Sequence, residues 1–281
     1  MSPTRRRATM VLLVLVGVGT TVWATRRPSH AREWIPEQAV LPAIRIDRSS
    51  VLIEGFRSFR YTTTHRYTPG YDTRLLDLDR LTGVWFVLTP FAKSWRGPAH
   101  SFLTFGFADS QYVAISVEAR KEPGEKYGPV SGALRRYELM YVIGDERDLI
   151  GQRVLQDYPV YLYPIQAPRE RIRELFVAML ERAEALRQRP EFYNTLTNNC
   201  TSNLVDHVNR IVPGTIPPGW KTVLPGYIDD VGMRLGLIDT RLELTEARER
   251  FRINEAGRRH LADADFSHRI RESLGTPPTN R

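Results

Sequence analysis

The stretch HSFLTFGFADSQYVAISVEAR (residues 100–120) predicts a β-hairpin around which the rest of the fold is built. Two runs rich in β-branched and aromatic residues flank a short polar turn at Asp109. A tight turn centred on Asp109 places His100 opposite Glu118, at neighbouring strand ends on one face of the sheet. A turn shifted by one residue would put Glu118 on the other face. The hairpin therefore predicts an imidazole that is oriented by a carboxylate.

Strand-like runs lie on both sides of this hairpin, and helices follow them. Apolar residues between 172 and 186 recur every three or four positions, which predicts a helix with a single buried stripe. A second helix is expected to begin near Cys200 and to end at about Ile211, before Pro213 and Gly214. Strands followed by helices predict an α+β fold. The expected strands are residues 51–54, 83–89, 101–107, 111–117, 136–143 and 160–165.

The amino terminus has the pattern of a secretion signal or a signal anchor. An uncharged apolar run at residues 8–24 lies between two clusters of arginine. The run is near the lower limit for crossing a hydrocarbon core of ~30 Å, and its last residues also fit a cleavage site. We therefore expect residues 1–24 to be a transmembrane signal anchor or a cleaved signal peptide. The protein is then a single-pass inner-membrane protein with its carboxy-terminal domain facing the periplasm, or, after cleavage, a periplasmic protein.

The remainder divides by composition into three parts. Residues 25–50 carry several prolines and no clear period, so they are expected to form a linker. Residues 51–240 hold the strands and helices and form the expected globular domain, and residues 241–281 are expected to form a charged helical extension. Within the globular domain, the charged cluster at residues 145–148 is expected to be a solvated turn or a local salt-bridge cluster.

Composition and charge exclude several classes of protein. The 281 residues are 42% hydrophobic and 26% charged, which is typical of a globular protein. Six of the eight excess positive charges come from arginines within residues 1–32, so the body is near neutral and no nucleic-acid partner is expected. One cysteine excludes an internal disulfide and a multi-cysteine metal site, and the histidines show no metal-ligand spacing. We expect no metal and no cofactor.

Cys200 lies where the second predicted helix begins, with Asn198 as the expected N-cap. A helix N-terminus presents free N–H groups and a partial positive charge, and both stabilise a thiolate. The flanking residues are polar, which argues against an apolar pocket around the thiol. The alternative is an inert buried cysteine that packs as a small hydrophobe.

A thiolate nucleophile needs an imidazole within hydrogen-bond reach. His207 lies two helical turns beyond Cys200, ~10.5 Å along the axis, and is too far away. His100 opens a strand and is the better candidate for the base. The loop at residues 119–130 leaves the sheet beside this site, as a wall of the cleft or as an ordinary hairpin loop. The residues expected to line the substrate-binding cleft are Tyr127, Tyr193 and Asn199.

Five blocks of the sequence occur in the same order as in a known protein family. They are HSFLTFGF (100–107), ISVEARKEPGE (115–125), YELMYVIGDERD (137–148), VYLYP (160–164) and EFYNTLTNNCTSN (191–203). With these blocks the chain, from about residue 51 to residue 266, resembles the bacterial Lnb N-terminal periplasmic domain family. The resemblance implies a permuted papain-like fold, similar to the NlpC superfamily, in which an antiparallel sheet packs on helices. In this arrangement the histidine strand precedes the cysteine helix.

The resemblance implies Cys200 as nucleophile and His100 as base, with Glu118 at a matching family position. In founding members the domain is joined to a multi-helix membrane region and transfers an acyl chain through a cysteine thioester to a lipidated cysteine. After Ala24 this sequence has no further apolar segment of membrane-spanning length. We expect a membrane-tethered periplasmic cysteine acyltransferase or hydrolase acting on membrane lipid or lipoprotein acyl groups. The alternatives are a cell-wall peptide amidase or peptidase, and a non-catalytic envelope binding protein with a buried, unreactive Cys200.

Overall fold

The main sheet of the protein is long, curved and almost wholly antiparallel. The structure, a computed structural model, describes residues 24–91, 95–156, 158–238 and 241–272, together with residues 9, 10, 17, 21 and 274. Within these residues the main sheet has the strand order β1-β2-β9-β8-β7-β6-β10, and β5 also pairs with β2. The pairing of β2 with β9 is parallel, and all the other pairs are antiparallel.

The strands of the main sheet are β1 (Ala43–Asp47), β2 (Ser50–Arg57), β5 (Tyr71–Asp77), β6 (Leu81–Pro90), β7 (Ala99–Phe107), β8 (Tyr112–Arg120), β9 (Glu138–Gly144) and β10 (Tyr161–Pro164). A second, small sheet pairs β3 (Arg60–Tyr61) with β4 (Tyr67–Thr68). The short helical segment η1 (Pro36–Gln38) precedes β1, while η2 (Leu78–Arg80) connects β5 to β6 and α2 (Pro129–Ala133) connects β8 to β9.

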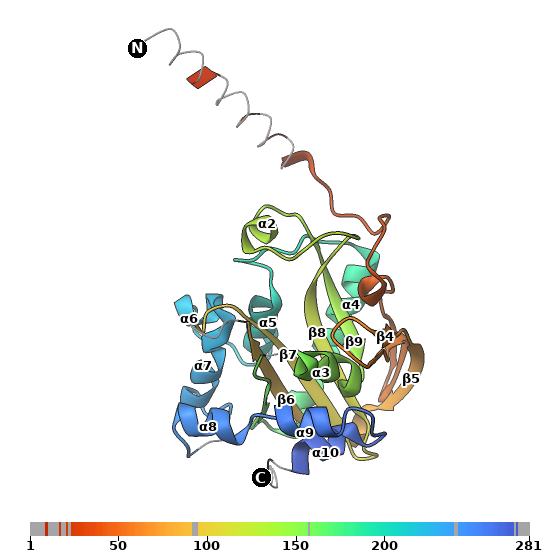
Figure 1. Ribbon diagram of the computed structural model, residues 1–281, viewed down its shortest axis with the longest axis vertical. Helices are drawn as coiled ribbons and strands as arrows, with labels where there is room; N and C mark the ends of the chain where they lie inside the picture. Colours follow the sequence, from red (N-terminus) through yellow and green to blue (C-terminus); the bar gives the residue numbers. More distant parts are fainter. Residues whose placement is uncertain are drawn as a thin grey trace.

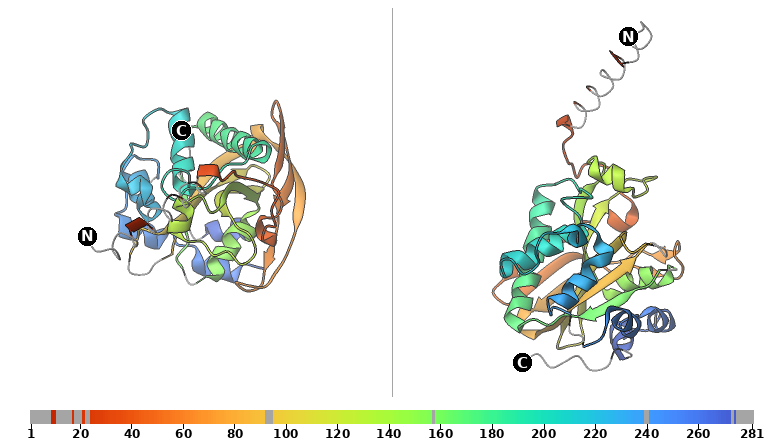
Figure 2. Two further views of the ribbon diagram at one scale, coloured as in Figure 1. Left: turned by 90° about the horizontal axis from the view of Figure 1, so that it is seen from above. Right: turned by 90° about the vertical axis from the view of Figure 1, so that its left-hand side faces the viewer.

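Helices cover both faces of the sheet, and the alternation of side chains along β7 shows which helices lie on which face (Figures 1 and 2). Ser101 contacts α5 (Cys200–Ile211), and Phe105 packs on α4 (Arg169–Gln188). Thr104, on the opposite face, donates a hydrogen bond to α3 (Glu146–Leu155). The remaining helices are α6 (Trp220–Val223), η3 (Pro225–Tyr227), α7 (Ile228–Arg234), α8 (Leu244–Arg250), α9 (Asn254–Arg259) and α10 (Phe266–Glu272).

The α+β prediction is confirmed, and so are the two long helices. The stripe expected between residues 172 and 186 is the buried face of α4, because all seven of its predicted apolar positions are buried. The helix α5 begins at Cys200 and ends at Ile211, as expected. The sheet and its two helical layers thus place the start of β7 beside the start of α5, where His100 and Cys200 lie.

The cluster at residues 145–148 is neither a solvated turn nor a local salt-bridge cluster, so this prediction was wrong. It forms the beginning of α3, with Asp145 as N-cap, and the side chains of Glu146 and Asp148 are fully buried. Buried carboxylates need partners, and these come from distant parts of the chain. Arg57 donates to Asp148 at 2.7 Å, and Arg271 donates to Glu146 at 2.7 Å. The sequence around residue 146 carries no sign of either partner.

The segment expected to be a linker contributes to the domain. It forms η1 and β1, and residues 29–38 pack beside the ends of β8 and β9. Ser29 N–H donates to Glu138, and the guanidinium of Arg120 lies 4.1 Å from the ring centre of Trp34. These contacts fix the side of the domain at which the amino-terminal segment arrives (Figure 1).

The expected signal anchor at residues 1–24 lies largely outside the described residues. In the described part of the chain, no helix combines the length and the apolar character needed to cross a bilayer.

The buried Arg57–Asp148 pair ties β2 to α3, so its loss should destabilise the fold strongly. We expect Asp148→Ala to lower the free energy of unfolding by about 3–5 kcal/mol, because Arg57 is left charged and buried without its partner. Urea denaturation measures the change. Asp72→Ala is the matched control, because Asp72 pairs with Arg74 at the surface, and we expect a change within about 0.5 kcal/mol. Equal effects of the two variants would contradict the importance assigned to the buried pair.

Candidate functional site

Cys200 is held at the first position of α5 by a complete capping box. Asn199 accepts a hydrogen bond from Ser202 N–H at 2.9 Å, and the Ser202 hydroxyl accepts one from Asn199 N–H at 2.8 Å. The N-cap is therefore Asn199. We predicted Asn198, which was wrong by one residue. Asn198 instead braces the preceding loop, because its side-chain amide donates to Phe192 O. The N–H of Cys200 lies in the first helical turn, where no intrahelical acceptor exists.

His100 lies near the start of β7 and points to the face of the sheet that carries Glu118. The register of β7 and β8 pairs Leu103 with Ile115, as a turn centred on Asp109 requires, so the predicted register is confirmed. Nε2 of His100 lies 3.1 Å from Oε1 of Glu118. The hairpin thus brings the imidazole and the carboxylate into direct contact.

Two further residues fix the carboxylate of Glu118. The Ser116 hydroxyl lies 2.7 Å from His100 Nε2 and donates to Glu118 Oε1 at 2.8 Å. Arg153, on α3, donates to the same oxygen at 3.1 Å. Burial alone would raise the pKa of Glu118, but the charges of His100 and Arg153 and these hydrogen bonds outweigh it and hold the pKa well below its usual range. Glu118 is therefore an anion that faces the imidazole.

The electrostatics favour an ion pair between Cys200 and His100. Burial alone would lower the pKa of His100, but the charge of Glu118 and hydrogen bonds to Cys200 and Glu118 raise it to about 9. Burial alone would raise the pKa of Cys200, but the hydrogen bond to His100, its charge, and hydrogen bonds from Ser101 lower it. Nε2 of His100 faces Ser116 and Glu118, so Nδ1 is the ring nitrogen left to serve the thiol. A thiolate beside an imidazolium is the reactive form of a catalytic cysteine.

Cys200 and His100 line a cavity of about 220 Å³. Tyr193 and Tyr127 line it, and their hydroxyl oxygens lie 3.3 Å apart. Asn199 is not among the lining residues, because its side chain is occupied in capping α5 and in donating to Thr195 O. The lining residues are Phe91, Ala99, His100, Val117, Glu118, Ala119, Lys121, Tyr127, Arg153, Tyr193 and Cys200.

Ser116, Ser101 and Arg153 were not predicted from the sequence. Ser116 precedes Glu118 by two residues on the same strand, so strand alternation alone could have placed it beside His100. Arg153 lies on α3, a helix that was not predicted, and nothing near it in the sequence points to the site. His207, which was judged too far away to serve Cys200, contacts Tyr141 at 2.9 Å in the interior. Among the residues that the structure describes, no group of His, Cys, Asp and Glu is arranged to hold a metal ion.

Removing the charge of Glu118 should weaken the imidazolium of His100. In Glu118→Gln, burial is no longer offset by the carboxylate, so the pKa of His100 falls. Because the protonated ring is then lost at a lower pH, we expect the alkaline limb of the activity profile to move towards neutral pH by about one pH unit or more. Glu122→Gln is the matched control, since Glu122 pairs with Arg32 and not with His100. An alkaline limb that stays in place would contradict the role given to Glu118.

Comparison with known proteins adds one finding. A family model described as the Lnb N-terminal periplasmic domain matches residues 67–226, a stretch that contains every residue of the site. No curated protein and no solved structure matches the chain.

Proposed function

Because the chain belongs to the Lnb N-terminal periplasmic domain family, we propose that it is a periplasmic cysteine acyltransferase or hydrolase. The observation that carries the proposal is the 3.1 Å contact of His100 with Glu118 in the wall of a cavity that Cys200 also lines. The order of the parts supports a permuted papain-like arrangement, since the strand with the histidine precedes the helix with the cysteine. The proposal extends to the amino terminus, where residues 1–24 would tether the domain to the inner membrane.

The chemistry begins with attack of the Cys200 thiolate on an ester or amide carbonyl carbon. A C–S bond forms, and the carbonyl oxygen takes up the negative charge. When the tetrahedral intermediate collapses, the bond to the leaving oxygen or nitrogen breaks, and the His100 imidazolium gives its proton to that atom. An amine or a water molecule then attacks the thioester after His100 takes its proton, and the thiolate leaves. An amine acceptor makes the protein a transferase, and water makes it a hydrolase.

The negative oxygen of the intermediate needs hydrogen-bond donors, and two are available. One is the N–H of Cys200 in the first turn of α5. The other is the hydroxyl of Tyr193, which is buried in the cavity wall close enough to Cys200 for their charges to interact. Burial and the charge of Cys200 raise the pKa of Tyr193, so its hydroxyl keeps its proton and remains a donor.

Removing the Tyr193 hydroxyl should therefore slow the chemical step. We expect Tyr193→Phe to lower kcat by about 10²-fold with little change in KM, the usual cost of losing one donor to an oxyanion. Steady-state kinetics with a soluble thioester or ester substrate measures this. Tyr127→Phe is the matched control. It removes the neighbouring hydroxyl, which contacts the hydroxyl of Tyr193 and is not assigned to the oxyanion, so we expect only a small loss of kcat. A kcat unchanged in Tyr193→Phe would remove this residue from the mechanism.

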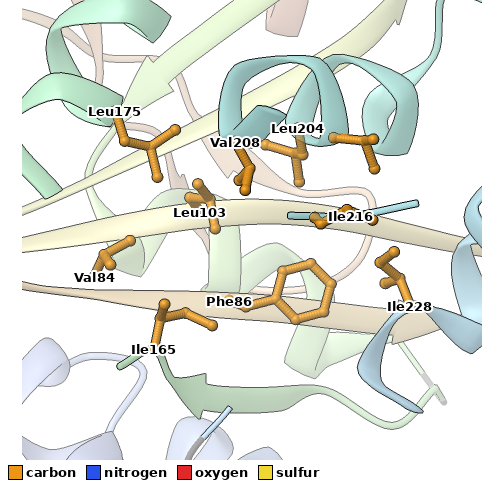
Figure 3. Close-up of a pocket in the computed structure, with 10 residues that line it drawn as sticks. Val84, Phe86, Leu103, Ile165, Leu175, Leu204, Val208, Ile216 and Ile228 are labelled. Carbon is orange, nitrogen blue, oxygen red and sulfur yellow. The ribbon is translucent and has the colours of Figure 1, made fainter. Parts of the chain in front are cut away.

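An apolar cavity supports an acyl group as the substrate (Figure 3). It lies between the sheet and α5, and apolar side chains line it entirely. Leu204, one turn beyond Cys200 on the same buried side of α5, forms part of its wall, and Val208 continues the wall in the next turn. A hydrocarbon chain gains free energy by leaving water for such a lining, whereas a cell-wall peptide does not. The other lining residues are Val84, Phe86, Leu103, Ile165, Leu175, Val205, Ile216 and Ile228.

The test of the proposed function is detection of the acyl-enzyme. The full chain is incubated with phospholipid, with diacylated lipopeptide or with cell-wall peptide, and its intact mass is then measured. We expect an increase equal to one acyl group with a lipid substrate, located at Cys200 by peptide mapping and removed by hydroxylamine. Modification by cell-wall peptide alone would favour an amidase or peptidase. An unmodified Cys200 with all three substrates would contradict the proposal.

A further inference from the structure

Large apolar side chains are exposed beside the mouth of the catalytic cavity. On the short helix α2 and the residue after it, Val130 is 73% exposed and Leu134 is 57% exposed. In the loop before Cys200, Leu196 is 60% exposed. Neighbouring hydrogen bonds hold the two segments together, because Thr195 donates to Pro129 O at 2.8 Å and Asn194 to Ala133 O at 3.1 Å. We call Val130, Leu134 and Leu196 the apolar tip.

The apolar tip lies at the end of the domain where the amino-terminal segment arrives (Figures 1 and 2). Contacts connect the two places. Ser29 N–H donates to Glu138, and the neighbouring Tyr137 hydroxyl accepts a hydrogen bond from Gly128 N–H, directly before α2. If residues 1–24 tether the domain to the inner membrane, as proposed above, the apolar tip therefore faces the same bilayer.

The charges around the apolar tip favour an anionic surface. Residues 121–136, which lead into and through α2, carry four basic and two acidic residues. Both acidic residues are already paired, Glu122 with Arg32 and Glu125 with Arg136. Exposed apolar side chains next to basic residues are the pattern of a segment that inserts shallowly among anionic lipid headgroups.

The tip is also continuous with the site. Tyr127 is 42% exposed beside α2 and at the same time lines the catalytic cavity, where its hydroxyl lies 3.3 Å from that of Tyr193. Resting on the proposed function, we propose that the apolar tip docks on the surface of an anionic bilayer and brings the mouth of the cavity to its lipids. The substrate is then taken from the membrane surface and not from solution.

The first experiment measures the depth of single positions in the full chain bound to vesicles. In a Cys200→Ser background, Leu196→Cys or Val130→Cys is labelled with a solvatochromic dye, and vesicles of phosphatidylethanolamine and phosphatidylglycerol are added. We expect a blue-shifted emission that lipid-borne nitroxide quenches at both positions. Leu75→Cys is the matched control, because Leu75 is 66% exposed on β5, away from α2, and should stay in water.

The second experiment separates docking from chemistry. We expect Leu196→Glu to lower acyl transfer from vesicle lipid by about tenfold, while alkylation of Cys200 by iodoacetamide in solution is unchanged. Leu75→Glu should leave both unchanged. The inference is overturned if dyes at residues 130 and 196 stay in water on vesicles, or if they shift without lipid as protein concentration rises, which would indicate a second copy. Normal dye quenching with no acyl transfer by the wild-type protein would instead count against the proposed function and leave the docking intact.

Discussion

Cys200→Ala is expected to abolish acyl-enzyme formation and to lower turnover by about 10⁴-fold or more. Among the described residues that line the cavity, the sulfur of Cys200 is the only atom that is both polarised by an imidazole and placed at a helix N-terminus. Cys200→Ser should be almost as inactive, because a serine hydroxyl beside His100 is far less acidic than a thiol and stays protonated. Intact-mass analysis and steady-state turnover with the same lipid substrate measure the two effects.

The fold of these variants has to be checked before the loss is assigned to chemistry. Cys200→Ser replaces one atom, and the capping of α5 depends on Asn199 and Ser202 and not on the thiol. We therefore expect the urea midpoint of Cys200→Ser to match that of the wild type closely. Turnover that survives in Cys200→Ala would show that another group is the nucleophile.

His100→Gln is expected to give the second largest effect, a loss of the thiolate at neutral pH. Without the imidazolium, burial is the dominant influence on Cys200 and raises its pKa. Because a higher thiol pKa leaves a smaller fraction of thiolate at pH 7, the nucleophile becomes scarcer. We expect alkylation by iodoacetamide at this pH to slow by about 10-fold to 100-fold, and turnover to fall by about 10²-fold to 10⁴-fold.

His207→Gln is the matched control for this variant. His207 is also buried, but it contacts Tyr141 and not Cys200, and burial lowers its pKa to about 4. Its loss should leave the pH dependence of alkylation unchanged, whatever its effect on stability. An alkylation profile that is the same in His100→Gln and in the wild type would contradict the ion pair.

The local patterns in the sequence were sufficient for the parts of the site that depend on neighbouring residues. Strand alternation and a tight turn at Asp109 placed Glu118 beside His100, and a polar segment before an apolar stripe placed Cys200 at a helix start. The N-cap was predicted one residue too early, because Asn198 and Asn199 have the same capping propensity. Only the partner at the third position of the helix, Ser202, distinguishes them in the structure.

The parts that depend on distant residues could not be predicted. Glu146 and Asp148 are charged side chains in a polar sequence, and only their pairing with Arg271 and Arg57 makes their burial possible. The helix that they begin carries Arg153 into the site, so missing α3 also meant missing that contact with Glu118. The apolar tip was missed for a related reason, because exposure is a property of the fold and cannot be read from three separate apolar residues.

The chemistry proposed here requires the Cys200 thiol to ionise below its ordinary range because His100 is charged beside it. The most direct measurement is the rate of alkylation of the wild-type protein by iodoacetamide between pH 4 and pH 10. We expect the rate to rise with an inflection well below the value of ~8.5 for a free thiol. An inflection at or above that value, or a thiol that does not react at any pH in this range, would contradict it.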